Sequence, residues 1–243
     1  MFSDFFTHVV QWGPQLLRGA ELTLYVSVIT MVLATILGAM LGLVRERRVP
    51  VLNQLIVGYV EILRGLPTIL VLFIFYFGFP TAGITISNNP VIVGVLGLTL
   101  SLAAYLSEVF RAAIMAVDAG QLEAAKSLGM STVQAQIKIV LPQAFLVAVP
   151  SLGSFFIGLI KDTSLLSFIS VSDLLKVGND IVSATFLSFQ VYLIVGALYV
   201  LMSIVASRLV IGIEHRLRPL ENRTSVRLAG PAGVAGVGLS DRI

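Results

Sequence analysis

Three uninterrupted apolar runs constrain the fold of this chain more than any other feature. Residues 22–44, 139–160 and 181–207 contain no Asp, Glu, Lys or Arg. Each run is long enough for a helix to cross a hydrocarbon core, which takes about 20 residues. The whole chain follows the same pattern, with 57% hydrophobic and only 12% charged residues, whereas soluble domains carry about 25% charged residues. We therefore expect an integral membrane protein.

Two further apolar stretches, residues 65–79 and 91–107, reach spanning length only if they take in charged residues. The first must extend back to about residue 56 and the second forward past residue 107, which draws an acid and a base into each span. These pairs are Glu61 with Arg64 and Glu108 with Arg111. The result is an all-α polytopic membrane protein of about five transmembrane helices. Five helices are few to enclose a path, so we expect a dimer.

Basic residues at the ends of the runs predict how the chain is oriented. Arg45, Arg47 and Arg48 follow the first run, and Arg208, Arg216 and Arg218 follow the last. Because cytoplasmic loops carry the excess of Lys and Arg, we expect the N-terminus outside and the C-terminus in the cytoplasm. The transmembrane domain is expected over residues 1–220, with a flexible cytoplasmic tail over 221–243. Residues 165–171 should lie along an interface or re-enter the membrane, and residues 172–180 should lie outside.

Several kinds of chemistry are excluded by the residues present. The stretch nearest to a phosphate-binding loop, residues 120–127 (GQLEAAKS), has Ala125 where the second glycine should stand and no preceding strand. We expect no ATP hydrolysis and no other catalysis on this chain. The chain has no cysteine, and its two histidines lie at opposite ends, so we expect no metal site. The net charge is +3, and the basic residues border the apolar spans. This placement favours a role in orienting the chain in the membrane over nucleic-acid binding.

The polar interval from residue 123 to 142 does not have the composition of a simple loop. Apolar residues recur in it at steps of three and four, which is typical of a helical face, and Gly129 interrupts the pattern. The positions are Leu122, Ala125, Leu128, Gly129, Val133, Ile137 and Val140. We expect two short helices with a bend, lying outside the bilayer.

This interval resembles the EAA loop of type I ABC importer permeases. The motif is Glu123-Ala124-Ala125, three residues, Gly129, nine residues, and then Ile139-x-Leu141-Pro142. In that family the loop, here at about residues 120–142, docks into a groove of the cytoplasmic ATPase subunit. The resemblance implies that Glu123, Ala124, Ala125 and Gly129 couple the chain to an ATPase dimer. Without the motif, the same interval would read as an ordinary amphipathic surface helix.

The charged residues drawn into the spans have two interpretations. Together with Lys161 and Asp162 they supply both signs of charge, which could bind the ammonium and carboxylate groups of a zwitterion. Alternatively, Glu61–Arg64 and Glu108–Arg111 are internal ion pairs that hold helices together. Asp162 is the better site candidate, because Lys161 points elsewhere on a helix and Ser164 adds a hydroxyl.

Three further elements resemble the polar amino-acid branch of the same family. They are residues 61–67 (EILRGLP), 105–111 (YLSEVFR) and 161–165 (KDTSL). The resemblance implies a MetI-like fold and a substrate site in the membrane, in which Arg64 meets the α-carboxylate and Asp162 and Glu108 face amino groups, with Glu61 and Ser164 nearby. It also implies a second permease subunit (the same chain or a close paralogue), an ATPase dimer that binds ATP and Mg²⁺, an extracytoplasmic binding protein, and a bacterial inner membrane location.

The sequence therefore predicts the permease subunit of an ATP-driven importer for polar amino acids. Basic amino acids, glutamate, glutamine and cystine are the candidate substrates. An ion-coupled secondary amino-acid carrier is the alternative, in which the intramembrane acids bind protons or Na⁺. A membrane scaffold with purely structural charge pairs also stays open.

Overall fold

The computed structural model describes residues 2–46 and 50–228, with side-chain surroundings for residues 10–46 and 50–217. This part of the chain is helical and contains no β-strand. The α-helices are α1 (Phe2–Glu46), α2 (Pro50–Gly65), α3 (Thr68–Phe73), α4 (Phe79–Thr81), α5 (Pro90–Met115), α6 (Ala119–Ser127), α7 (Thr132–Ala135), α8 (Leu141–Asp162), α9 (Leu174–Thr185) and α10 (Ser188–Leu228). Two π-helical turns, η1 (Ile74–Gly78) and η2 (Gln136–Val140), and a 3₁₀-helix, η3 (Thr163–Ile169), join some of them.

Four helical segments of the described chain are long and apolar enough to cross a membrane. They are Val10–Glu46, Pro90–Met115, Thr132–Ile169 and Ser188–Leu217. A bent pair, Pro50–Gly65 with Thr68–Thr81, brings the number to five if the pair counts as one span. The prediction of an all-α membrane protein with about five spans is confirmed.

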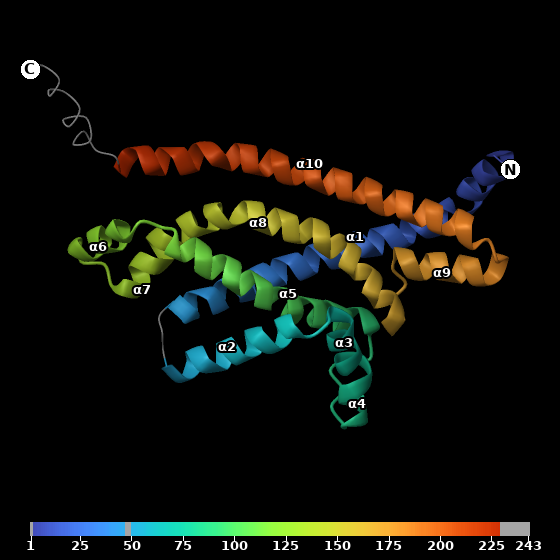
Figure 1. Ribbon diagram of the computed structural model, residues 1–243, viewed down its shortest axis with the longest axis horizontal. Coiled ribbons are helices and arrows are strands. Elements are labelled where there is room, and N and C mark those ends of the chain that lie inside the picture. The colour runs from blue at the N-terminus through green and yellow to red at the C-terminus, as the bar shows by residue number, and fades with distance from the viewer. Residues whose placement is uncertain (1, 47–49, 229–243) are drawn as a thin grey trace, which may run out of the picture.

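The second span, which the sequence analysis extended back to about residue 56, is not one continuous helix. It bends by 107° between α2 and α3, and the α3 end turns away from the other helices in Figure 1. Pro67 is the cause, because it has no backbone N–H to donate and disfavours helical geometry at Leu66. Pro67 adopts φ −56° and ψ 133°, an extended conformation. At the end of α2 the Arg64 carbonyl accepts a hydrogen bond from the Tyr105 hydroxyl of α5 at 3.4 Å.

The last span also differs from the prediction, because residues 181–185 belong to the separate helix α9. Phe186 ends α9 in the left-handed conformation at φ 59°, and α10 begins two residues later. The interval 172–180 is not simply an exposed loop, since Asp173 is 1% exposed and caps the N-terminus of α9. Residues 165–169 belong to η3, which buries Leu166 and Ile169 in the core.

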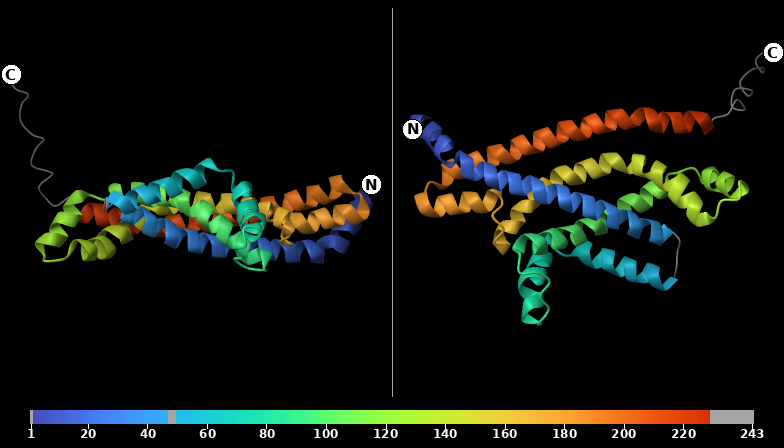
Figure 2. Two further views of the ribbon diagram at one scale, coloured as in Figure 1. Left: turned by 90° about the horizontal axis from the view of Figure 1, so that it is seen from below. Right: turned by 180° about the vertical axis from the view of Figure 1, so that it is seen from behind.

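The centre of the molecule is formed by α1 packed against α5. Gly38 and Gly42 of α1 permit this contact, because an added Cβ would lie 2.7 Å from the Leu106 Cβ and 2.9 Å from the Phe110 Cβ. Leu106 and Phe110 are completely buried. Helix α8 packs against both α5 and α1, and α10 packs along α8 (Figure 2). Small residues that let helix backbones approach closely are typical of membrane helix packing.

The two ends of the molecule carry different elements. Figure 1 places α6, α7, the end of α1 and the end of α10 at one end, and α9 with the N-terminus at the other. Helix α10 continues to Leu228, past residue 221, where the sequence analysis began a flexible tail. The rest of that predicted tail, residues 229–243, lies outside the described residues.

Candidate functional site

A cavity of about 380 Å³ lies between the start of α3, the middle of α5 and the end of α8. Its volume is in the range of small-molecule sites, about 300–1,000 Å³. The lining is mostly apolar with a few polar groups, as is usual for such sites. The lining residues are Thr68, Leu98, Ser101, Leu102, Tyr105, Ser154, Phe155, Gly158, Leu159 and Asp162.

Asp162 supplies the only carboxylate among these lining residues. It is the last residue of α8, where the chain tightens into η3. Its neighbour Lys161 lines a different cavity, between α8 and α10. The two charges therefore serve different surfaces, as their positions on a helix predicted.

Ser101 adds an unsatisfied hydroxyl to the cavity. Its Oγ is buried and has no hydrogen-bond partner among the described residues. A buried polar group without a partner is costly, so a hydrogen bond from a group that enters the cavity would stabilise this hydroxyl. Ser101, Tyr105 and Glu108 follow one face of α5 at helical spacing.

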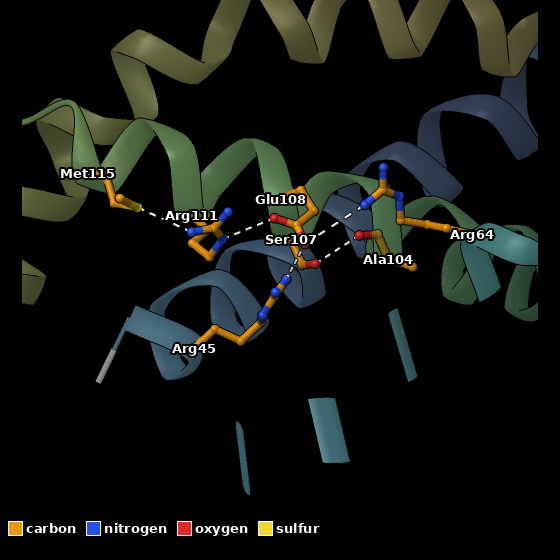
Figure 3. A network of polar contacts seen from close by, with 7 residues as sticks. All are labelled: Arg45, Arg64, Ala104, Ser107, Glu108, Arg111 and Met115. Atoms are coloured by element: carbon orange, nitrogen blue, oxygen red, sulfur yellow. Dashed lines mark hydrogen bonds and ion pairs between the residues drawn. The ribbon is translucent and has the colours of Figure 1, made fainter. Parts of the chain in front are cut away.

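Next to this cavity, a single carboxylate is surrounded by three arginines (Figure 3). Arg45 Nη1 of α1 donates to Glu108 Oε1 at 2.6 Å, and Arg111 Nε donates to Glu108 Oε2 at 3.0 Å. Arg64 Nη1 lies 3.8 Å from Glu108 Oε1 and is the loosest of the three. Burial of Glu108 is tolerated because charged groups in a membrane core need partners of opposite sign.

Arg64 lies between this cluster and the cavity. Its guanidinium sits over the Tyr105 ring, 5.5 Å from the ring centroid, and Tyr105 lines the cavity. A cation over an aromatic face is favourable by about 0.5–2 kcal/mol. The position depends on the bend at Pro67, since Arg64 is the penultimate residue of α2.

The segment from α6 to α7 is two short helices joined by a tight bend, as predicted. Gly129 adopts φ +81°, a conformation that few residues other than glycine accept. The Met130 N–H donates to the Ala125 carbonyl and the Gly129 N–H to the Lys126 carbonyl, which is a Schellman ending of α6. Ser131 and Gln134 then form a capping box that starts α7.

Residues 119–140 are called the coupling segment here, after the role predicted from the sequence. Only some of the apolar side chains of this segment face the protein interior. Ala125 and Val140 are buried, but Leu128 is 84% exposed at the tip, and Val133 and Ile137 are also exposed. The apolar face is divided at Gly129, where the sequence analysis placed the interruption. Gly129 reverses the chain after one short helix, so the period does not continue from α6 into α7.

Comparison with known proteins identifies the family. The family described as binding-protein-dependent transport system inner membrane component matches residues 34–219, most of the chain. The chain belongs to this family. It is thus a multi-pass inner membrane subunit of a transporter.

Several relatives of this permease are similar over nearly their full length. A probable amino-acid permease protein, YxeN of Bacillus subtilis (strain 168), is 39% identical over 80% of this chain and 87% of its own. A probable glutamine ABC transporter permease protein, GlnM of the same organism, is 36% identical over 82% and 90%. A solved amino acid ABC transporter structure, described as containing histidines, matches with a TM-score of 0.78 and 31% identity over 87% and 98%. The type I ABC importer permease fold is confirmed.

The structure places the predicted substrate residues of this permease in three different surroundings. Asp162 lines the cavity, Arg64 stands beside it, and Glu108 is held by arginines. Ser164 and Glu61 are not among the lining residues, and Glu61 is exposed on α2. The Glu108–Arg111 pair forms as one of the two predicted internal pairs, but Glu61 forms no ion pair with Arg64 among the described residues.

The predicted coupling residues of the permease also differ in their surroundings, since some are exposed and one is buried. Glu123, Ala124 and Gly129 are exposed, whereas Ala125 is 4% exposed and packs inward. The sequence analysis missed Arg45, Ser101 and Tyr105. Helical spacing from Glu108 could have found the last two, but no sequence signal links Arg45 to Glu108.

Proposed function

We propose that this permease imports polar amino acids, delivered by an extracytoplasmic binding protein and driven by a separate ATPase dimer. The observation that carries the proposal is the cavity, which presents the Asp162 carboxylate while the Arg64 guanidinium stands beside its Tyr105 wall. An amino acid carries an ammonium and a carboxylate, and each needs an opposite charge when it leaves water. The names of the relatives, one an amino-acid permease and one a glutamine permease, support the substrate class.

Each side chain has a role in this proposal. Asp162 would pair with an ammonium group, and the Ser101 hydroxyl would accept or donate a second hydrogen bond. Arg64 would bind the α-carboxylate through its planar fork of N–H donors. Glu108 already has three arginine partners, so its part would be to hold Arg64, while Glu61 and Ser164 would act from outside the cavity lining.

The coupling segment would dock on the ATPase, which would bind ATP and Mg²⁺. Glu123, Ala124, Gly129 and the tip residue Leu128 offer the exposed surface for this contact. The inward Ala125 would keep α6 in place. The segment and the end of α10 would then face the cytoplasm, and the start of α1 would lie outside, which agrees with their positions at opposite ends of the molecule in Figure 1. A second subunit, identical or a close paralogue, would complete the permease.

The test is amino-acid uptake by the complex in proteoliposomes, with arginine, histidine, glutamine, glutamate and cystine in turn. Asp162→Asn should lower uptake of the preferred substrate about tenfold or more, since one charge-assisted contact is lost. Lys161→Gln is the matched control, because this neighbouring charge lines another cavity, and it should keep near-normal uptake. Equal uptake by the parent and Asp162→Asn for all five substrates would remove Asp162 from the site.

The same preparation separates an ATP-driven importer from an ion-coupled carrier. Affinity purification of the chain from membranes, followed by mass spectrometry, should recover a cytoplasmic ATPase. Uptake that proceeds without ATP and follows a proton or Na⁺ gradient would instead establish the secondary carrier.

A further inference from the structure

We infer that Arg45 and Glu46, at the C-terminal end of α1, link the coupling segment to the substrate cavity. The inference rests on the proposed function and adds two positioning residues to it. Glu46 contacts the coupling segment, and Arg45 contacts the cluster beside the cavity. Two consecutive residues thus join the parts of the molecule that an ATP-driven importer must move together.

The first contact is between Glu46 and Gln136. Gln136 Nε2 donates to Glu46 Oε2 at 2.6 Å, across 90 residues of sequence. Gln136 is 3% exposed and begins η2, which connects α7 to α8. A short hydrogen bond to a carboxylate is among the stronger polar contacts in proteins. Movement of the coupling segment would therefore pull directly on the end of α1.

The space around this hydrogen bond, between the end of α1, the end of α5 and the coupling segment, is not completely filled by side chains. A cavity of about 190 Å³ lies beside it, with Glu46 and Gln136 in its wall together with residues from the end of α5 and from α6. A gap in packing forfeits dispersion contacts between the elements on either side. The Glu46–Gln136 hydrogen bond is therefore a polar connection between α1 and the coupling segment at the edge of this cavity.

Over the turns of α1 that precede Glu46, α1 and α5 are packed tightly enough to move as one body. An added Cβ at Gly42 would meet the Ser107 carbonyl oxygen at 2.9 Å, and one at Gly38 would meet the Leu106 backbone carbon at 3.1 Å. Closely packed interiors transmit displacement rather than absorb it. A shift at the end of α1 would reach the middle of α5.

The last step runs from Arg45 to the cavity through Glu108 (Figure 3). Arg45 holds Glu108 at 2.6 Å, and Glu108 contacts Arg64 at 3.8 Å. Arg64 in turn covers the cavity residue Tyr105. Because the Glu108–Arg64 contact is the longest, a small movement of Glu108 would decide whether Arg64 pairs with it or is free for a substrate carboxylate.

The experiment compares Glu46→Ala, Gln136→Ala and the double variant in the complete complex. Each single variant should lose about fivefold in substrate-stimulated ATP hydrolysis and in uptake per ATP, the size expected from one hydrogen bond. Assembly with the ATPase and basal hydrolysis should stay unchanged. The double variant should be no worse than Gln136→Ala alone, because the bond to Glu46 is already absent in that single variant.

A matched control is Gln143→Ala on α8. The Gln143 amide donates to the Ile139 carbonyl one turn earlier at 2.9 Å, so this glutamine hydrogen bond stays within the continuous helical segment Thr132–Ile169 and does not connect it to α1. It should keep parental coupling. The exchanged variant, Glu46→Gln with Gln136→Glu, should recover uptake per ATP, since the donor and acceptor are merely reversed.

Two results would overturn the link while the proposed function stands. One is parental uptake per ATP in Glu46→Ala and Gln136→Ala, and the other is losses that add in the double variant. If the single variants fail to assemble, the exchanged variant decides: recovery supports the link, and an assembled but uncoupled complex contradicts it. A parental complex without substrate-stimulated hydrolysis would instead overturn the proposed function.

Discussion

Asp173 illustrates how one residue outside the membrane spans connects two helices, α9 and α10. Its Oδ1 accepts from the Lys176 N–H at 3.0 Å and its Oδ2 from the Leu175 N–H at 3.2 Å, which caps α9. The Tyr199 hydroxyl of α10 donates to Oδ2 at 3.2 Å. The next backbone N–H, of Leu174, donates to the Thr23 Oγ1 of α1 at 3.2 Å. Burial outweighs these hydrogen bonds and raises the pKa of Asp173 from 3.8 to about 6.

This pKa predicts how stability depends on pH. The folded protein binds the Asp173 proton more tightly than the unfolded chain, so its contribution is complete below about pH 4 and is lost as pH rises through about 6. Above that range the buried charge costs on the order of 3 kcal/mol. Asp173→Asn keeps the cap and removes the charge, so its thermal unfolding temperature in detergent should change less between pH 5 and pH 8 than that of the parent.

Asp180→Asn is the control for this prediction. Asp180 is an exposed acid on the same helix that pairs with Lys176. Removing it should leave the parental pH dependence in place, because exposed ion pairs contribute little. An identical pH slope in the parent and in Asp173→Asn would show that another group controls this transition.

At the scale of the helices, the contact of α1 with α5 depends on the absence of side-chain atoms. The clearest position is Gly38, where an added Cβ would lie 2.7 Å from the Leu106 Cβ. Gly38→Ala should lower the unfolding free energy by about 1–3 kcal/mol, because overpacking forces the helices apart. Thermal unfolding in detergent measures this loss, and uptake should fall in parallel if α1 and α5 transmit movement.

Gly58 of α2 provides the matched comparison. It is also a helical glycine, but an added Cβ there meets nothing within 4 Å. Gly58→Ala should be neutral or stabilising by about 0.5–1 kcal/mol, since alanine is the better helix former. Equal effects of the two substitutions would mean that the close α1–α5 approach does not limit stability.

At the scale of the whole molecule, the coupling segment and the cavity are separate parts that must act together. Glu123 is exposed on α6, far along the chain from Asp162, so its substitution should not disturb the cavity. Glu123→Arg should uncouple ATP hydrolysis from uptake while the subunit still inserts and folds, because a bulky cation would enter the proposed ATPase groove. The measurement is uptake per ATP together with recovery of the ATPase on purification.

Glu123→Gln serves as the conservative control, since it keeps the shape and removes only the charge. It should retain more coupling than Glu123→Arg. Parental coupling in Glu123→Arg would count against docking through this segment.

Much of this protein is determined by local sequence properties. Long charge-free runs predicted the membrane helices, because burying a run of apolar residues in lipid needs no particular partner. The two helices of the coupling segment follow from chemistry within a few residues, including the left-handed Gly129 and the Ser131–Gln134 capping box. The end of α2 is also determined locally, because Pro67 disfavours helical geometry at the residue before it and so predicts a helix end there.

Only the tertiary structure decided which charges meet and what they surround. Glu108 pairs with Arg45 across 63 residues of sequence, and that pairing depends on how α1 and α5 are rotated and placed against each other. The same packing buries Asp173, moves Glu61 to the surface and gathers Ser101, Tyr105 and Asp162 around one cavity. Helical periodicity says which residues share a face, but the facing helix is chosen by close packing over the whole chain.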